Sequence, residues 1–150
     1  MSEKSLWTFT RNGVKSVVPS HELHIERIEN GVALGTPDVN YCIRGQAGWI
    51  ELKFLPEWPK RSTTLVRVDH FTKEQRIFLH NYSMAGGRCF VWVQVKDEYF
   101  LFDGLIAAMF LGYDSNSDNG WRRKDFTEKS LLHFRKGGVQ WDTVIQAITK

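Results

Sequence analysis

The chain has 150 residues, which is enough for one domain with a sizeable hydrophobic core, and we expect a single domain over residues 1–150. With 42% hydrophobic and 25% charged residues and no apolar run near the roughly 20 residues of a membrane span, a membrane protein is excluded. The net charge of +3 is too small to identify a nucleic-acid partner by itself.

The first third of the chain predicts a helix followed by a strand. Apolar residues at loose helical spacing predict a helix over Ser5–Val18 that ends or breaks at Asn12–Gly13. Alternation of polar and apolar residues predicts a half-buried strand over His21–Glu29. A glycine-bounded loop, Asn30–Thr36, follows.

Two short runs of β-branched and aromatic residues predict a β-hairpin. The runs are Val39–Ile43 and Trp49–Phe54, and the connection Arg44–Gly48 contains two glycines that suit a tight turn. The next stretch, Leu55–Phe71, carries two prolines and several charges, so it indicates an excursion from the sheet with a short strand at Leu65–Val68.

A capping box starts the next predicted helix. Threonine and glutamine three residues apart in Thr72–Gln75 match the pattern, and Gly86–Gly87 ends the helix. Strongly β-prone residues then predict a strand pair, Arg88–Val95 and Glu98–Phe102.

The last third predicts helices. These are Leu105–Leu111, Thr127–Arg135 and Trp141–Ile148, with a polar surface loop at Tyr113–Gly120. We therefore expect a mixed sheet covered by helices, with its core at about residues 20–112 and a C-terminal helical extension at about 121–150.

The first hairpin carries the residues with the clearest chemistry. Glu51 and Lys53 are two apart on a predicted strand, so both leave the same face, and an antiparallel partner can bring Asp38 level with Glu51. Two carboxylates suit Mg²⁺ or Mn²⁺, which polarises a phosphate and activates water, and an ammonium can offset developing negative charge. The alternative is an exposed polar stripe on an edge strand with Asp38 as a turn residue.

Two short motifs on either side of the hairpin turn resemble, in their order, the signature of PD-(D/E)XK nucleases. The first is Gly35-Thr36-Pro37-Asp38, and the second is Trp49-Ile50-Glu51-Leu52-Lys53. With the helix and strand that follow, the resemblance covers about Glu22–Asp103 and extends to phage nucleases and Holliday junction resolvases. It implies an α/β fold with a restriction-endonuclease-like mixed β-sheet flanked by helices. It also implies that Asp38 and Glu51 are metal ligands and that Lys53 is the catalytic lysine.

Members of these families often add an N-terminal acid and a glutamine from the following helix. Glu3, Glu26 and Glu29 are candidates for the acid, and we favour Glu29 as a third metal ligand. Gln75 is the candidate glutamine of the catalytic set, although its capping role explains it equally well.

Basic residues gather in two regions. Between Trp121 and Lys136 they outnumber acids and are mixed with aromatics, a pattern that suits phosphate contacts, although a solvated helix face explains it as well. The predicted DNA-binding residues are Lys60, Arg61, Arg67, Arg122, Arg123 and Lys124. His70 precedes the capped helix and is either a phosphate contact or an ordinary loop residue.

These observations predict a Mg²⁺-dependent endonuclease, with Mn²⁺ as a substitute, that hydrolyses DNA phosphodiester bonds and prefers branched DNA such as a Holliday junction. Resolvases act as homodimers, so a homodimer is expected. The alternatives are a phage nicking, homing or repair nuclease, a non-catalytic nucleic-acid-binding module, and a small-molecule hydrolase with the same metal site.

The N-terminus lacks the apolar stretch and cleavage site of a secretory signal, so we expect a cytoplasmic protein, or a phage-encoded one in the host cytoplasm. Cys42 and Cys89 lie in apolar, strand-like sequence without CxxC spacing. They are therefore expected to be buried free thiols.

Overall fold

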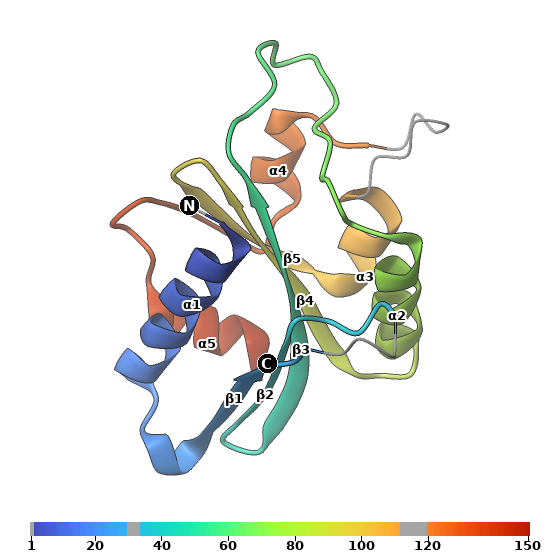
Figure 1. Ribbon diagram of the computed structural model, residues 1–150. Helices are drawn as coiled ribbons and strands as arrows, with labels where there is room; N and C mark the ends of the chain where they lie inside the picture. The colour runs from blue at the N-terminus through green and yellow to red at the C-terminus, as the bar shows by residue number, and fades with distance from the viewer. Residues whose placement is uncertain (1, 30–33, 112–119) are drawn as a thin grey trace.

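The computed structural model describes residues 2–29, 34–111 and 120–150, which form a mixed six-stranded sheet with helices on both faces (Figure 1). Strand order in the sheet follows chain order. The strands are β1 (Leu23–Arg27), β2 (Val39–Ile43), β3 (Gln46–Leu55), β4 (Arg88–Val95), β5 (Glu98–Asp103) and β6 (Leu132–Arg135). The helices are α1 (Glu3–Val17), the 3₁₀ turn η1 (Ser20–Glu22), α2 (Lys73–Met84), α3 (Gly104–Ile106), its π-helical continuation η2 (Ala107–Leu111), α4 (Arg123–Lys129) and α5 (Trp141–Ile148).

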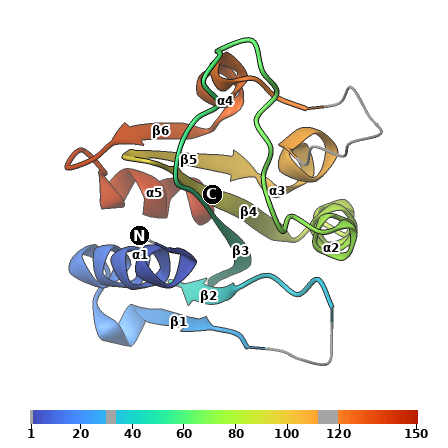
Figure 2. The ribbon, with the colours of Figure 1, turned by 45° about the horizontal axis from the view of Figure 1, so that its top comes forward.

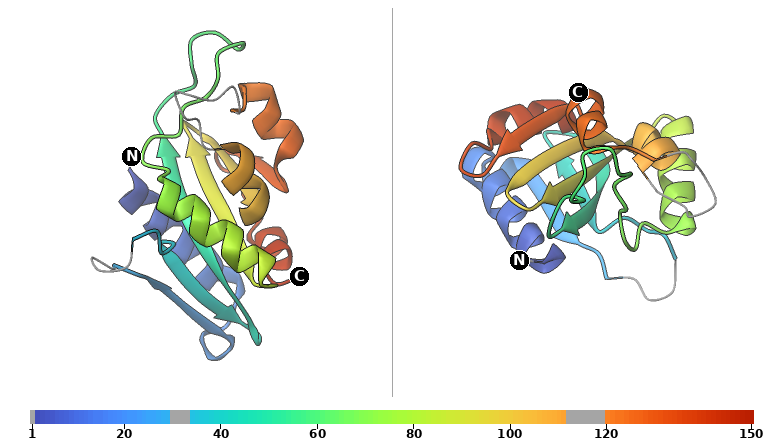
Figure 3. Two further views of the ribbon diagram at one scale, coloured as in Figure 1. Left: turned by 90° about the vertical axis from the view of Figure 1, so that its right-hand side faces the viewer. Right: turned by 90° about the horizontal axis from the view of Figure 1, so that it is seen from above.

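One parallel pairing divides the sheet. β3 and β4 run parallel, and every other neighbouring pair is antiparallel. Parallel neighbours require a crossover, which here consists of residues 56–72, called the β3–α2 segment below, and α2 itself. The β3–α2 segment rises well above the end of β3 before it returns to α2 (Figures 1 and 3).

The sheet separates two hydrophobic cores. α1 and α5 cover one face, where Ile50, Leu52 and Trp92 point inward. The other face packs Val91 and Val93 against α2, η2, α4 and the β3–α2 segment, and Figure 2 shows the helices on the two sides. Since neighbouring residues of a strand point to opposite faces, β3 and β4 supply apolar side chains to both cores.

The helix predicted to break at Asn12–Gly13 does not break, because α1 runs through both residues to Val17. A Cβ atom at Gly13 would lie 1.9 Å from an atom of the Trp141 ring. The glycine therefore permits close packing of α1 against α5, and the prediction was wrong because a glycine in a helix also serves packing.

Two other predicted elements were wrong. The helix expected over Thr127–Arg135 is divided into α4, which ends at Lys129, and the edge strand β6. β6 forms because Leu132–Arg135 pairs with β5, a contact remote in sequence. No strand forms over Leu65–Val68, where the Val66 N–H instead donates to the carbonyl of Trp121 at 2.8 Å.

Two further elements agree only in part: the strand predicted over His21–Glu29 is shortened to β1, because η1 takes its first two residues, and the helix predicted over Leu105–Leu111 is mostly the π-helical η2. The other elements agree with the sequence. β2 and β3 form the predicted hairpin, with a turn at Arg44 and Gly45 that has positive φ at both residues. The Thr72 capping box starts α2. Most of the predicted loop Tyr113–Gly120 and residues 30–33 of the loop Asn30–Thr36 lie outside the described residues.

The predicted fold class, an α/β mixed sheet flanked by helices, is confirmed. Both cysteines are free thiols, with Cys89 buried and Cys42 half-buried. None of the helices in the described residues is long and apolar enough to cross a membrane.

Candidate active site

Asp38 lies where β2 meets β3. Val39 pairs with Ile50, so the preceding residue Asp38 falls opposite Glu51. The carboxylate Oδ2 of Asp38 accepts a hydrogen bond of 2.9 Å from the Leu52 N–H, a donor beyond the last pair of the hairpin. The strand register therefore brings Asp38 to Glu51.

Glu51 and Lys53 point from β3 to the face covered by α2 and the β3–α2 segment. They alternate with Ile50 and Leu52, which enter the opposite core. Only 1% of Glu51 and 2% of Lys53 is exposed, and the ammonium Nζ of Lys53 lies 3.4 Å from Oε1 of Glu51. The alternative of an exposed polar stripe is wrong, because both side chains are buried.

The end of the β3–α2 segment holds Lys53. Its ammonium donates to the carbonyl oxygen of His70 at 2.9 Å and lies 5.6 Å from the centre of the Phe71 ring. His70 has φ of +63°, a conformation that costs a non-glycine residue about 1–2 kcal/mol. His70 therefore contacts the site through its backbone, while its side chain is exposed.

The surroundings of Glu51 favour its neutral form. Burial raises the pKa of Glu51 to about 9, the negative charge of Asp38 adds to the rise, and the positive charge of Lys53 opposes it. Among the described residues, no donor reaches the buried Oε2 of Glu51. The Asp38 carboxyl lies beside the Glu51 side chain, and the two groups can form a hydrogen bond only when they share a proton.

Glu3 joins this group from the first turn of α1. Burial raises the pKa of Glu3, with opposing effects from the charges of Lys53 and Asp38, so all three lie within electrostatic range. Glu3 is half-buried, whereas Glu29 is exposed beyond the end of β1 and Glu26 is exposed and paired with His24. The geometry therefore favours Glu3 over our preferred Glu29 as the extra acid.

The arrangement fits a hard divalent cation that keeps open coordination positions. In residues 2–29, 34–111 and 120–150, no group of three or more His, Cys, Asp or Glu side chains is arranged to enclose a metal. Mg²⁺ commonly takes only one or two protein carboxylates and completes its shell with water and phosphate oxygens. Asp38 and Glu51 would supply such a pair, and Oε2 of Glu51, which accepts no hydrogen bond within the described part of the chain, has lone pairs for a cation.

Gln75 has a structural role at the start of α2. Its side-chain oxygen accepts from the Thr72 N–H at 3.0 Å, and its own N–H donates to the Thr72 hydroxyl oxygen at 3.2 Å. This is the capping box that the sequence also allowed. The predicted catalytic role of Gln75 gains no contact from this geometry.

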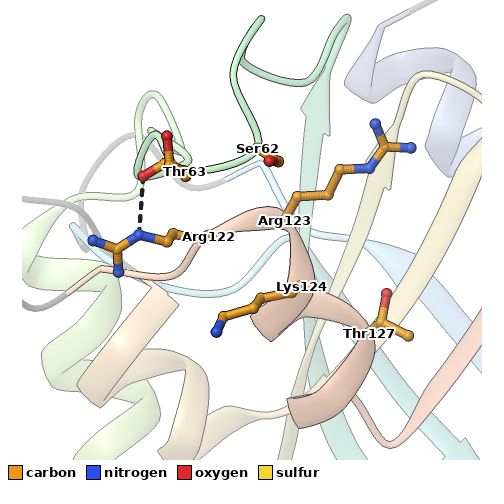
Figure 4. A pocket seen from close by; sticks show the side chains of 6 residues that line it. All are labelled: Ser62, Thr63, Arg122, Arg123, Lys124 and Thr127. Atoms are coloured by element: carbon orange, nitrogen blue, oxygen red, sulfur yellow. Dashed lines mark hydrogen bonds between the residues drawn. The ribbon is translucent and has the colours of Figure 1, made fainter.

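The predicted DNA-binding residues form two exposed groups. Lys60, Arg61 and Arg67 lie on the β3–α2 segment, and Arg67 is paired with Asp69 at 3.2 Å. Arg122–Lys124 begin α4 and line a hollow with Ser62 and Thr63 (Figure 4). The tertiary structure therefore brings the two sequence regions together.

Sequence reasoning missed a buried network beside this hollow. Glu98 is 6% exposed and accepts hydrogen bonds from Trp58 at 2.7 Å, from His133 at 3.0 Å and from Arg123 at 3.3 Å. The four residues come from four separate parts of the chain. Their spacing carried no motif that could have revealed the network.

Comparisons with known proteins agree with this architecture at the level of fold. Neither protein-family models nor curated protein sequences match the chain. Among solved structures, it resembles Hjc, a Holliday junction resolvase from the archaeal hyperthermophile Archaeoglobus fulgidus, at a TM-score of 0.50 and 12% identity, over 95% of this chain and 98% of that chain. The chain therefore shares the fold of this resolvase.

Proposed function

We propose that this protein is a metal-dependent endonuclease that hydrolyses DNA phosphodiester bonds, with branched DNA as its substrate. One observation carries the proposal: Asp38, Glu51 and Lys53 converge, and a buried oxygen of Glu51 has no donor among the described residues. Burying ionisable groups is costly, so a fold that keeps Glu51 and Lys53 buried beside the half-buried Asp38 points to chemistry.

Each residue has a distinct part. Asp38 and Glu51, with Glu3 as the additional acid, hold Mg²⁺, and Mn²⁺ can replace it. The bound ion polarises the scissile phosphate and lowers the pKa of a water molecule. Lys53, fixed by Glu51 and the carbonyl of His70, offsets the negative charge that develops on the phosphate.

The preference for branched DNA rests on the shared fold with a protein whose name states that substrate. The exposed basic residues on the β3–α2 segment and α4 support a DNA backbone contact. Cleavage assays with Mg²⁺ on four-way junction, flap, nicked, duplex and single-stranded DNA test this choice. We expect the junction to be cut fastest, and equal cutting of all five would reject the resolvase function while retaining a nuclease.

Two substitutions test the catalytic assignment. Asp38→Asn and Glu51→Gln are expected to abolish cleavage and to leave junction binding intact or stronger, because each removes negative charge near the phosphate. Glu57→Gln is a matched control, since Glu57 is exposed and paired only with Lys96 among the described residues. Full activity of either site variant would reject the assignment.

Lys53→Ala separates a nuclease from a binding module. We expect a loss of cleavage on the order of 10²–10³-fold with unchanged DNA affinity, because Lys53 acts on the transition state. Binding without cleavage by the wild-type protein in both Mg²⁺ and Mn²⁺ would instead establish a non-catalytic module.

A homodimer is the proposed assembly, since two-fold symmetry suits paired cuts across a junction. Exposed apolar side chains support it: Ile77 on α2 and Met109 on η2 are 47% and 52% exposed and line one hollow. Light scattering should give twice the chain mass, and Met109→Asp should lower it toward that of one chain. A wild-type monomer at micromolar concentration would reject the dimer.

A further inference from the structure

The hollow beside α4 has the composition of a phosphate-binding site. It is open, measures about 580 Å³, and lies between the β3–α2 segment and α4 (Figure 4). Its lining residues are Ser62, Thr63, Arg122, Arg123, Lys124 and Thr127. Three cations and three hydroxyl groups surround it, and none of these six residues is acidic. Side chains of these types make most protein contacts to nucleic-acid phosphates.

The two walls of the hollow are tied together. Nε of Arg122 donates to the carbonyl of Thr63 at 2.9 Å, and the Val66 N–H donates to the carbonyl of Trp121 at 2.8 Å. One guanidinium N–H is used in this way, out of the five that arginine carries. The hollow is therefore held in shape while Arg122 keeps donors for a ligand.

Arg123 has a different role from its neighbours. Its guanidinium donates to Glu98 at 3.3 Å and stacks 4.8 Å from the centre of the Trp58 ring. In Figure 4 the Arg123 side chain extends to the opposite side from Arg122 and Lys124. Its charge is thus balanced by a buried carboxylate, and it fastens α4 to the β3–α2 segment.

The hollow and the candidate active site share the β3–α2 segment. Thr63 lines the hollow, and the carbonyl of His70 accepts from Lys53. The seven residue steps between them span at most about 25 Å of backbone. One strand of DNA carries a phosphate about every 3.4 Å, so both sites lie within reach of one short stretch of DNA.

We propose that this hollow is a second phosphate-binding subsite that holds the DNA backbone away from the cleaved bond through Arg122 and Lys124, with Arg123 positioning its walls. The inference rests on the proposed function in one respect, which is that the ligand is DNA. It adds a second binding site, in which Arg122 and Lys124 contact the phosphate and Arg123 has a structural role.

The salt dependence of DNA affinity tests the subsite without cleavage. In the full chain carrying Glu51→Gln, dissociation constants for a four-way junction are measured between 50 and 200 mM salt. Each phosphate contact contributes about one unit to the slope of log affinity against log salt. Arg122→Ala and Lys124→Ala should each lower the slope by about one unit.

Three further variants serve as comparisons. Lys129→Ala removes an exposed charge of α4 outside the hollow and should leave the slope unchanged. Arg123→Ala should lower the thermal midpoint and leave the slope unchanged, because Arg123 acts through Glu98. Arg122→Lys keeps the charge and should keep the slope. Unchanged slopes in both Arg122→Ala and Lys124→Ala would overturn the subsite, and Lys124→Ala alone decides if Arg122→Ala does not fold.

Cleavage of the same junction by the wild-type chain in Mg²⁺ is measured separately. Cleavage with unchanged slopes would reject the subsite and retain the nuclease. Lowered slopes without cleavage would reject the nuclease and retain the subsite.

Discussion

Replacing Glu51 with glutamine should stabilise the metal-free protein at neutral pH. Glu51 is buried, and its pKa rises from 4.5 to about 9, chiefly through burial and then through the charge of Asp38. Between these values the folded protein holds a proton that the unfolded chain has released. The contribution of Glu51 to stability is therefore complete below about pH 4.5 and is lost as pH rises toward 9.

The size of the effect follows from the pKa difference. Each pH unit above 4.5 costs the folded protein about 1.4 kcal/mol, so at pH 7 the cost is about 3 kcal/mol. Glutamine has nearly the shape of the protonated acid and does not ionise. Glu51→Gln should therefore raise the free energy of unfolding by about 3 kcal/mol at pH 7 and change it little at pH 4.5.

Urea denaturation in EDTA, followed by tryptophan fluorescence at several pH values between 4.5 and 9, measures the difference. Glu98→Gln is the matched control, because Glu98 is also buried but accepts hydrogen bonds from Trp58, His133 and Arg123. It should lower stability by about 1.5–3 kcal/mol. The electrostatic reasoning would be refuted if Glu51→Gln were less stable than wild type at pH 7. It would also be refuted if the difference in free energy of unfolding between the two proteins were the same at all pH values.

Three further predictions concern stability. Mg²⁺ should raise the unfolding midpoint of the wild type and not that of Glu51→Gln. At a Mg²⁺ concentration a hundred times its dissociation constant, the free energy of unfolding should rise by about 2.7 kcal/mol. An equal rise in both proteins would place the ion elsewhere. Gly13→Ala should cost about 1–3 kcal/mol in thermal denaturation because its methyl group meets Trp141, and a stabilised variant would contradict that packing. His70→Val should be less stable than His70→Gly by at least about 1–2 kcal/mol, because a non-glycine residue pays that cost at φ of +63° and a β-branched residue tolerates this φ least. Equal stability of the two variants would exclude backbone strain.

Features encoded by short-range patterns were predictable. The β2–β3 hairpin follows from two β-prone runs around a glycine turn, and alternation along β3 places Glu51 and Lys53 on one face. The start of α2 follows from the Thr72 capping box. In each case the information lies within about ten residues, where local geometry determines the outcome.

Features that depend on distant partners were not predictable. The segment Leu132–Arg135 reads as the end of a helix, and it becomes a strand because the edge of β5 is available for pairing. Glu3 is one of three candidate acids, among which the sequence analysis favoured Glu29, and packing of α1 on the sheet brings Glu3 near Asp38 and Lys53. The network around Glu98 likewise joins residues that share no spacing.

The sequence by itself determined the hairpin and the shared face of Glu51 and Lys53, because strand alternation is a local property. Only the tertiary structure decided how deeply the pair is buried, that the carbonyl of His70 holds Lys53, and that Arg122 meets Thr63. The physical reason is that burial and electrostatic environment depend on which distant segments pack together, and no single segment encodes its neighbours.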